Sequence, residues 1–408
     1  MNYLFYKLPR WINFVLSLLI FLALAKIFLL SSTKDAFHYS WYLGPINSIT
    51  ENYKLLDNVA SQYGYLNILL ISKLSDLFNI STSDVLICTI IFLFLIFYLL
   101  FFYKIIKITN LPITTISLFL CYLIFGNIGH SNLAGAMFIP SSSVFRFLPS
   151  LITIILFSQI VIKNEKKILL FSFYLSFFIS LIWSIESAIF VALPLGLFLI
   201  IKLFFFLISK DKLNLNISLF LKKFYFKIIF GFLLLISILL FVNFDNFYLF
   251  YEHAFNSEAS LSKEILNNKI TLVYLYLLIL CYFILRDSFK HKNIFYYNVL
   301  WFGLFVAYSS YFLVRSVDSN FLNILPFILF ILCCMKVNSN QLKELRVNTI
   351  IIIIFFSLIS SIISTIQNKE RFFNNLFSSN YFNKPKFLRN DYLPDIRILN
   401  MIKNYPNT

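Results

Sequence analysis

Runs of about 20 consecutive apolar residues recur along the whole chain, and this repetition constrains the fold more than any other feature. A run of that length is what an α-helix needs to cross the hydrocarbon core of a bilayer. Backbone groups find no water inside the bilayer, so a spanning segment must satisfy them within a helix or a closed barrel. With 60% hydrophobic and 13% charged residues, the sequence predicts an all-α polytopic membrane protein.

The apolar runs predict about eleven transmembrane helices. No small-residue cleavage site follows the first run, so we expect it to be an uncleaved first helix. We divide the chain into a membrane domain, 1–366, and a short outer carboxyl-terminal tail, 367–408. The expected spans are 11–30, 84–103, 111–128, 146–162, 168–184, 187–208, 228–243, 270–285, 294–314, 320–335 and 347–366.

The distribution of charge orients these spans. In a soluble protein, a net charge of +16 would suggest binding to nucleic acid. In this chain, the positions of the positive residues mainly indicate which side of the bilayer each loop occupies. Lysines and arginines concentrate in alternate loops, which places the amino terminus inside and the first loop, 31–83, outside. The carboxylates favour the outer loops instead. Polar chemistry is therefore expected on the outer face.

The first outer loop holds the first candidate site, between Ser31 and Gly64. Asp35 and His38 are three residues apart, so on a helix they share a face. Gly44-Pro45 predicts the end of that helix. Taken alone, Asp35 has an alternative interpretation as an amino-terminal helix cap. The segment 65–78 is apolar but too short to span, which predicts an interfacial helix.

Charged residues at the ends of apolar runs are further candidate site residues, because a charge at the edge of the bilayer needs an oppositely charged partner or a function. Glu186 lies where the stretch 168–208, long enough for two spans, must turn outside. It either joins a site or caps the following helix. Arg146 and Arg315 lie at outer helix ends and suit a lipid-linked phosphate. Their alternative roles are snorkelling, or pairing with Glu186 and Asp318.

The absence of familiar motifs narrows the chemistry. The sequence contains no GxxxxGK[ST], GxGxxG, GxSxG or HExxH pattern. All five cysteines lie inside apolar runs, without the spacing of a disulfide framework or metal site. No cofactor is predicted, and a divalent metal is left open. An enzyme working outside must use a donor that is already outside, which favours a lipid-linked donor.

Four short segments resemble, in order and approximate spacing, the polytopic bacterial glycosyltransferases of the GT-C superfamily. They are KDAFHYSWYLGP, LLDNVASQYGYLNILL, WSIESAIF and YFLVRSVDSNFLNILPF. The resemblance implies a polyprenyl-phosphate sugar as donor and Asp35 as the catalytic acid. It also implies an inner-membrane protein with its site facing outward. Gln62, Tyr63 and Gly64 match an element of that family's first outer loop.

The resemblance suggests one catalytic residue and a set of substrate-binding residues. Asp35 would be the general base and His38 would orient it or bind the sugar. The remaining proposed substrate contacts are Gln62, Tyr63, Arg146, Glu186, Arg315 and Asp318. Better-known branches often carry two adjacent acids, whereas Lys34-Asp35-Ala36 supplies one, so a metal site in the first loop is doubtful and transfer without a metal stays open. Beyond the lipid-linked donor and membrane lipids, the acceptor stays open, and nucleic acid is not expected as a partner.

Two other functions compete with this interpretation. A flippase or exporter of lipid-linked saccharide should carry polar residues deep in several helices, but most spans here are uninterrupted. A polysaccharide polymerase or ligase should rely on a long outer loop with paired basic residues. The loop 244–269 is short and net acidic, so that function ranks lower.

Overall fold

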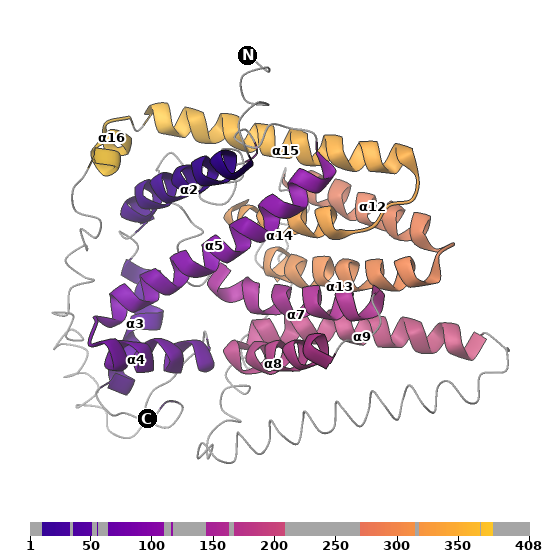
Figure 1. The fold of residues 1–408 in the computed structure, drawn as a ribbon, viewed down its shortest axis with the longest axis horizontal. Coiled ribbons are helices and arrows are strands. Elements are labelled where there is room, and N and C mark those ends of the chain that lie inside the picture. Colours follow the sequence, from indigo (N-terminus) through magenta and orange to yellow (C-terminus); the bar gives the residue numbers. More distant parts are fainter. Residues whose placement is uncertain are drawn as a thin grey trace.

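The computed structural model describes most of the apolar runs. The described residues are 10–32, 36–50, 55, 64–109, 116, 144–162, 167–208, 270–314, 318–367 and 369–377. The regular elements in these ranges are α-helices (Figure 1). The predicted all-α class is therefore confirmed for this part of the chain.

Every expected span that lies in the described ranges coincides with a helix. These helices are α2 (Arg10–Ser32), α5 (Thr82–Ile108), α7 (Val144–Ile162), α8 (Lys167–Trp183), α9 (Ile185–Ile208), α12 (Ile270–Ser288), α13 (Lys292–Val314), α14 (Asp318–Cys334) and α15 (Asn340–Gln367). Within the described residues, 4 helices are long and apolar enough to cross a membrane, namely α5, α7, α9 and α12. The expected spans 111–128 and 228–243 fall outside the described helices. The total of eleven therefore stays a prediction.

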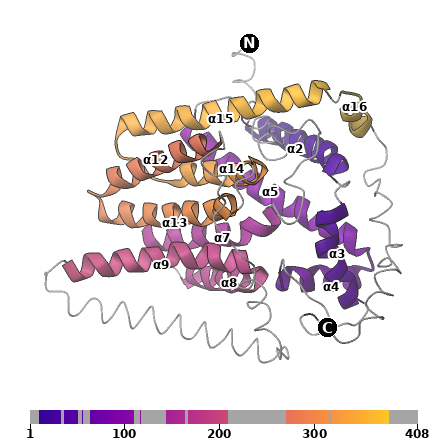
Figure 2. The same cartoon turned by 180° about the vertical axis from the view of Figure 1, so that it is seen from behind.

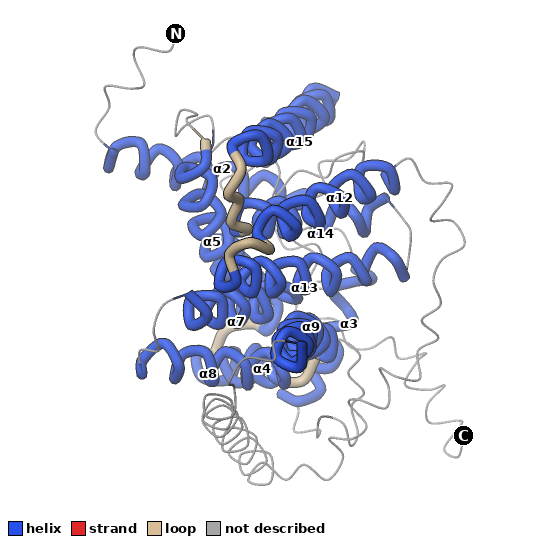
Figure 3. Tube along the Cα trace, turned by 90° about the vertical axis from the view of Figure 1, so that its right-hand side faces the viewer, coloured by secondary structure: helices blue, strands red, loops and turns tan. Residues whose placement is uncertain are grey.

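The helices follow one order across the molecule. Figures 1 and 3 show α15 at one edge, then α12 and α14, then α13, and α7, α8 and α9 toward the other edge. Aromatic rings fill the centre, where Phe97 of α5 lies 4.6 Å from Phe327 of α14 and Phe147 of α7 lies 5.0 Å from the same ring. Contacts between large aromatic side chains therefore contribute to packing in this core, together with the buried aliphatic side chains.

Helices α9 and α13 approach each other closely at Gly303. A Cβ atom added to this glycine would lie 2.8 Å from the Cα of Pro194. Real Cβ atoms are not found that close to a backbone carbon, so only glycine fits this contact. Small residues allow this kind of close helix packing in membrane proteins.

Two shorter helices lie beside one end of α5. They are α3 (Ala36–Thr50) and α4 (Leu66–Phe78), and Figure 2 shows them together near the amino end of α5. The expected helix at 65–78 is therefore confirmed as α4. Its buried face includes Asn67, Ser72 and Ser75, whereas Leu77 is 74% exposed. Both faces of α4 are mixed, since Ile68 is also buried and Lys73 is 74% exposed, and its place at the membrane interface stays a prediction.

The predicted helix end at Gly44-Pro45 is wrong. Helix α3 continues through Pro45 to Thr50. Proline removes one backbone donor from a helix, but packing of the residues that follow outweighs this local cost. Ile46 is fully buried, and the Ser48 hydroxyl donates to the carbonyl of Gly44 at 3.0 Å.

Candidate functional site

Two of the predicted site residues meet in an ion pair. Arg146 lies in the first turn of α7 and Glu186 in the first turn of α9. The Nη2 atom of Arg146 donates to Oε1 of Glu186 at 2.5 Å. Their side chains are 12% and 24% exposed, so the pair is largely shielded from solvent. Of the roles considered for Arg146, pairing with Glu186 is confirmed. We call this end of the helix bundle the site end.

The two residues of the pair differ in their surroundings. The guanidinium carbon of Arg146 lies 4.8 Å from the centre of the Tyr311 ring, near the carboxyl end of α13. This geometry is a cation–π contact. Oε2 of Glu186 is buried and has no hydrogen-bond partner among the described residues. A buried carboxylate oxygen without a donor is costly, and a hydroxyl or amine of a bound molecule would satisfy it.

Ser184, and not Glu186, caps the amino terminus of α9. The Ser184 hydroxyl accepts from the backbone N–H of Ser187 at 3.1 Å. The Ser187 hydroxyl in turn donates to the carbonyl of Arg146 at 2.8 Å, which fastens α9 to α7 beside the ion pair. Glu186 lies in the first turn, where the helix dipole favours a negative charge. A serine directly before the apolar run is the sequence signal that could have predicted this cap.

Trp183 joins three elements at the site end. Its ring nitrogen donates to the carbonyl of Phe145 at 2.6 Å, and its own carbonyl accepts from the backbone N–H of Tyr65 at 3.2 Å. Tyr42 of α3 packs edge-on against Phe145, with ring centres 5.6 Å apart. Helix α3 and the start of α4 are therefore attached to the same turn of α7 that carries Arg146.

Hydroxyl groups bind α7 to its neighbours deeper in the bundle. The Tyr308 hydroxyl donates to the carbonyl of Phe147 at 2.8 Å and lies 3.0 Å from the hydroxyl of Ser150. The hydroxyl of Thr153 lies 2.9 Å from that of Ser180 on α8. Such hydrogen bonds hold helices together where lipid offers no alternative partner. They fix α7 against α13 and α8, and so fix Arg146.

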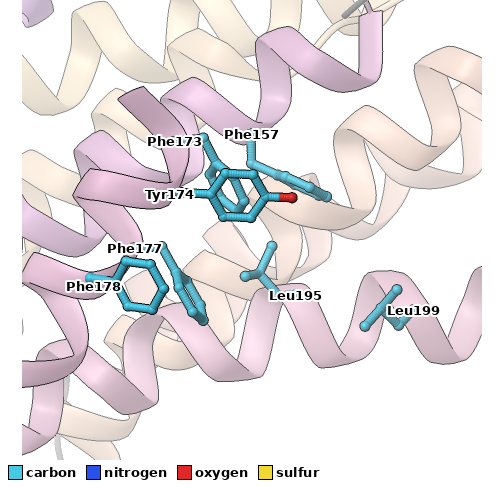
Figure 4. Close-up of a pocket in the computed structure, with 7 residues that line it drawn as sticks. All are labelled: Phe157, Phe173, Tyr174, Phe177, Phe178, Leu195 and Leu199. Atoms are coloured by element: carbon cyan, nitrogen blue, oxygen red, sulfur yellow. The ribbon is translucent and has the colours of Figure 1, made fainter. Parts of the chain in front are cut away.

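An apolar cavity of about 50 Å³ opens between the same helices that carry the ion pair (Figure 4). Its lining consists of aromatic and leucine side chains from α7, α8 and α9, namely Phe157, Phe173, Tyr174, Phe177, Phe178, Leu195 and Leu199. At 1.5 Å per helical residue, Leu195 lies about 13 Å along α9 from Glu186. The cavity therefore lies further along the helices than the ion pair, and its lining is apolar.

No family model, curated protein or solved structure matches this chain. The resemblance to GT-C glycosyltransferases therefore depends on the four short segments of sequence. The helices that are long and apolar enough to span support a membrane protein. The inner membrane and the outward orientation stay predictions.

The other predicted site residues cannot be placed against the ion pair. Asp35, Gln62, Tyr63 and Arg315 lie outside the described residues. His38 and Asp318 belong to α3 and α14, but the structure describes only their backbone. Within the part of the chain that the structure describes, no group of three histidine, cysteine or carboxylate residues could hold a metal ion. The grouping of Asp35 and Arg315 with Arg146 and Glu186 therefore stays a prediction.

Proposed function

We propose that the protein is a membrane glycosyltransferase that moves a sugar from a polyprenyl-phosphate donor to an acceptor hydroxyl on the outer face. The observation that carries this proposal is the position of Arg146 on the same three-helix unit as the apolar cavity. A polyprenyl phosphate combines an anionic head with a long hydrocarbon chain. A shielded cation at one end of apolar helices suits both parts of that molecule, because the phosphate can reach the guanidinium while the chain lies along the helix surface.

The reaction would be a direct displacement at the anomeric carbon. The acceptor oxygen attacks that carbon while its proton passes to the carboxylate of Asp35. The bond between the anomeric carbon and the phosphate oxygen breaks, and the electron pair leaves with the polyprenyl phosphate. Arg146 and Arg315 would stabilise the charge on that leaving group. His38 would orient Asp35 or bind the sugar, and the remaining substrate contacts would come from Gln62, Tyr63 and Asp318.

The attachment of α3 supports the placement of the general base near Arg146. Asp35 directly precedes the first residue of α3, and Tyr42 of the same helix contacts Phe145, the neighbour of Arg146. Glu186 does not prevent phosphate binding. A guanidinium has five N–H donors, so Arg146 can bind a phosphate oxygen while it keeps its hydrogen bond to Glu186.

The distribution of buried charge favours an enzyme over a flippase or exporter. A transport path for a charged saccharide needs polar or ionisable groups deep in several helices. Among the described residues, Arg346 is the one charged side chain that is buried, and it lies at the opposite end of the bundle from Arg146. The deep polar contacts of α7 are hydroxyl pairs that join helices.

Replacement of Asp35 by asparagine tests the proposal. Purified protein in lipid nanodiscs would be incubated with a panel of radiolabelled polyprenyl-phosphate sugars, and donor consumption would be measured. Asp35→Asn keeps the size of the side chain and removes the base, so the rate should fall at least about 100-fold. Asp76→Asn is the matched control, because Asp76 is a 42% exposed acid of α4 that pairs with Lys73.

Two results would contradict this proposal. One is transfer by Asp35→Asn at a rate close to that of the unaltered protein. The other is no consumption of any donor, together with movement of the lipid-linked sugar across the bilayer of reconstituted vesicles. The second result would favour the flippase.

A further inference from the structure

A second cationic cluster lies at the opposite end of the bundle from the site end. It consists of Lys104 on α5, Lys336 in the turn between α14 and α15, and Arg346 on α15. Arg146 contacts Tyr311 near the carboxyl end of α13, whereas Lys336 is bound to Asn298 near the amino end of that helix. The 13 helical residues between these contacts span about 20 Å. The cluster is therefore separate from the Arg146–Glu186 pair.

The backbone around Lys336 is held in place by buried polar side chains. Asn298 is fully buried, donates to the carbonyl of Lys336 at 2.7 Å and accepts from its N–H at 2.8 Å. Asp287 accepts from the N–H groups of Asn338 at 2.8 Å and Ser339 at 3.1 Å. The turn is thus fixed at Lys336 and at the residues that follow it, and the Lys336 ammonium group extends from this fixed backbone. It lies 5.2 Å from the centre of the Tyr297 ring.

Arg346 brings a second positive charge under the same turn. The residue is 7% exposed, and its Nη1 atom donates to the carbonyl of Met335 at 2.5 Å. Its Nε atom is buried and has no hydrogen-bond partner among the described residues. A buried guanidinium with an unmet donor favours a nearby anion.

Lys104 completes the cluster from α5. The rings of Phe101 and Phe330 are 5.7 Å apart, and one turn further along these two helices lie Lys104 and Cys334. Burial lowers the pKa of Lys336, and the nearby charge of Lys104 lowers it further. The ion pairs found in the described part of the chain are Lys73–Asp76 and Arg146–Glu186, so none of the three cations of the cluster is paired there.

The surface around the cluster includes exposed apolar side chains. Tyr103 and Ile106 flank Lys104 on α5 and are 56% and 36% exposed, and Leu345 beside Arg346 is 43% exposed. A soluble phosphate would gain nothing from these side chains. A phospholipid would place its acyl chains against them while its headgroup reaches the cations.

We propose that Lys104, Lys336 and Arg346 form a binding site for the phosphate of an anionic phospholipid headgroup. The two lysines contact the phosphate oxygens, and Arg346 adds positive charge beneath them. The site does not depend on the glycosyltransferase proposal.

The test measures lipid binding to the full chain by native mass spectrometry. Purified protein in detergent would be titrated with phosphatidylglycerol and, separately, with phosphatidylcholine that has the same acyl chains. We expect clearly tighter binding of phosphatidylglycerol. The double variant Lys104→Gln, Lys336→Gln should lose about 25-fold in affinity, because each lysine near an anionic headgroup contributes about fivefold.

The chain supplies a matched control for the same measurement. Lys107 on α5 and Lys343 on α15 are exposed cations within one helical turn of Lys104 and Arg346. Their double replacement by glutamine removes the same net charge and should change affinity less than about twofold. Replacement of Lys104 and Lys336 by arginine keeps both charges and should preserve binding.

Three results would overturn the proposal. They are equal binding of the two phospholipids by the unaltered protein, an equal loss in the control variant, and full competition by millimolar inorganic phosphate. The first result is measured on unaltered protein, so it tests the proposal even if the glutamine variant fails to fold. The third would assign the cluster to a soluble anion instead of a lipid.

Discussion

The Arg146–Glu186 pair should make a measurable contribution to folding stability. Removal of one partner from a fully buried pair costs about 3–5 kcal/mol, whereas an exposed pair contributes about 0.2–1 kcal/mol. With side chains 12% and 24% exposed, this pair falls between the two cases. We expect Glu186→Gln to cost about 1–2 kcal/mol, because the glutamine oxygen still accepts a hydrogen bond but carries no charge.

Arg146→Gln should cost more than Glu186→Gln. It removes the charge, the hydrogen bond and the cation–π contact with Tyr311, which adds about 0.5–1 kcal/mol. The total expected loss is about 2–3 kcal/mol. In the double variant neither charge remains unpaired, so the loss should be smaller than the sum of the single losses by about 1 kcal/mol.

A double-mutant cycle in mixed micelles measures this coupling. Each variant would be unfolded by increasing sodium dodecyl sulfate and followed by circular dichroism and tryptophan fluorescence. Trp183, one of the four tryptophans that contribute to the emission, donates to the carbonyl of Phe145, next to Arg146. The matched control cycle uses Lys73 and Asp76, whose side chains are 74% and 42% exposed, and should give coupling near zero. The reasoning would be refuted if the losses of the two single variants summed to the loss of the double variant within about 0.3 kcal/mol.

Two further predictions concern the packing that holds α7, α9 and α13. Tyr308→Phe should lose about 1 kcal/mol, because the fully buried hydroxyl no longer donates to the carbonyl of Phe147; an unchanged unfolding midpoint in the same micelle assay would contradict this. Gly303→Ala should cost about 1–3 kcal/mol, because the new methyl group would lie 2.8 Å from the Cα of Pro194. Gly196→Ala is its control in α9, since nothing lies within 4 Å of the added atom, and equal losses in the two variants would show that the close contact is not the cause.

The positions of the long helices followed from the sequence because bilayer thickness sets the length of an apolar run. The turn between α8 and α9 was predicted for the same reason, since 168–208 is too long for one span. The end of α3 could not be predicted in this way. Pro45 is a strong local signal, but the burial of Ile46 depends on neighbours that the local sequence does not reveal. Tertiary packing therefore decided the boundary.

The candidate site was only partly predictable. Arg146 and Glu186 were singled out because charge at the mouth of an apolar run is rare, and two such charges on one side of the bilayer tend to pair. Trp183 and Tyr308 were not singled out, since 20% of the residues are aromatic and no single ring stands out from that background. Lys104 and Lys336 were interpreted only as markers of orientation. Their convergence depends on the turn after α14, which sequence spacing does not describe.

The same helix, α13, connects two cations with opposite surroundings. At one end Tyr311 contacts Arg146, whose charge is balanced by Glu186; at the other end Asn298 holds Lys336, which has no carboxylate partner in the described part of the chain. The two contacts are about 20 Å apart along α13 and share no partner among the residues that the structure describes. Effects of substitutions at sites this far apart are expected to add. Loss of the proposed lipid binding at Lys336 therefore should not change the proposed sugar transfer at Arg146, and each proposal can fail while the other stands.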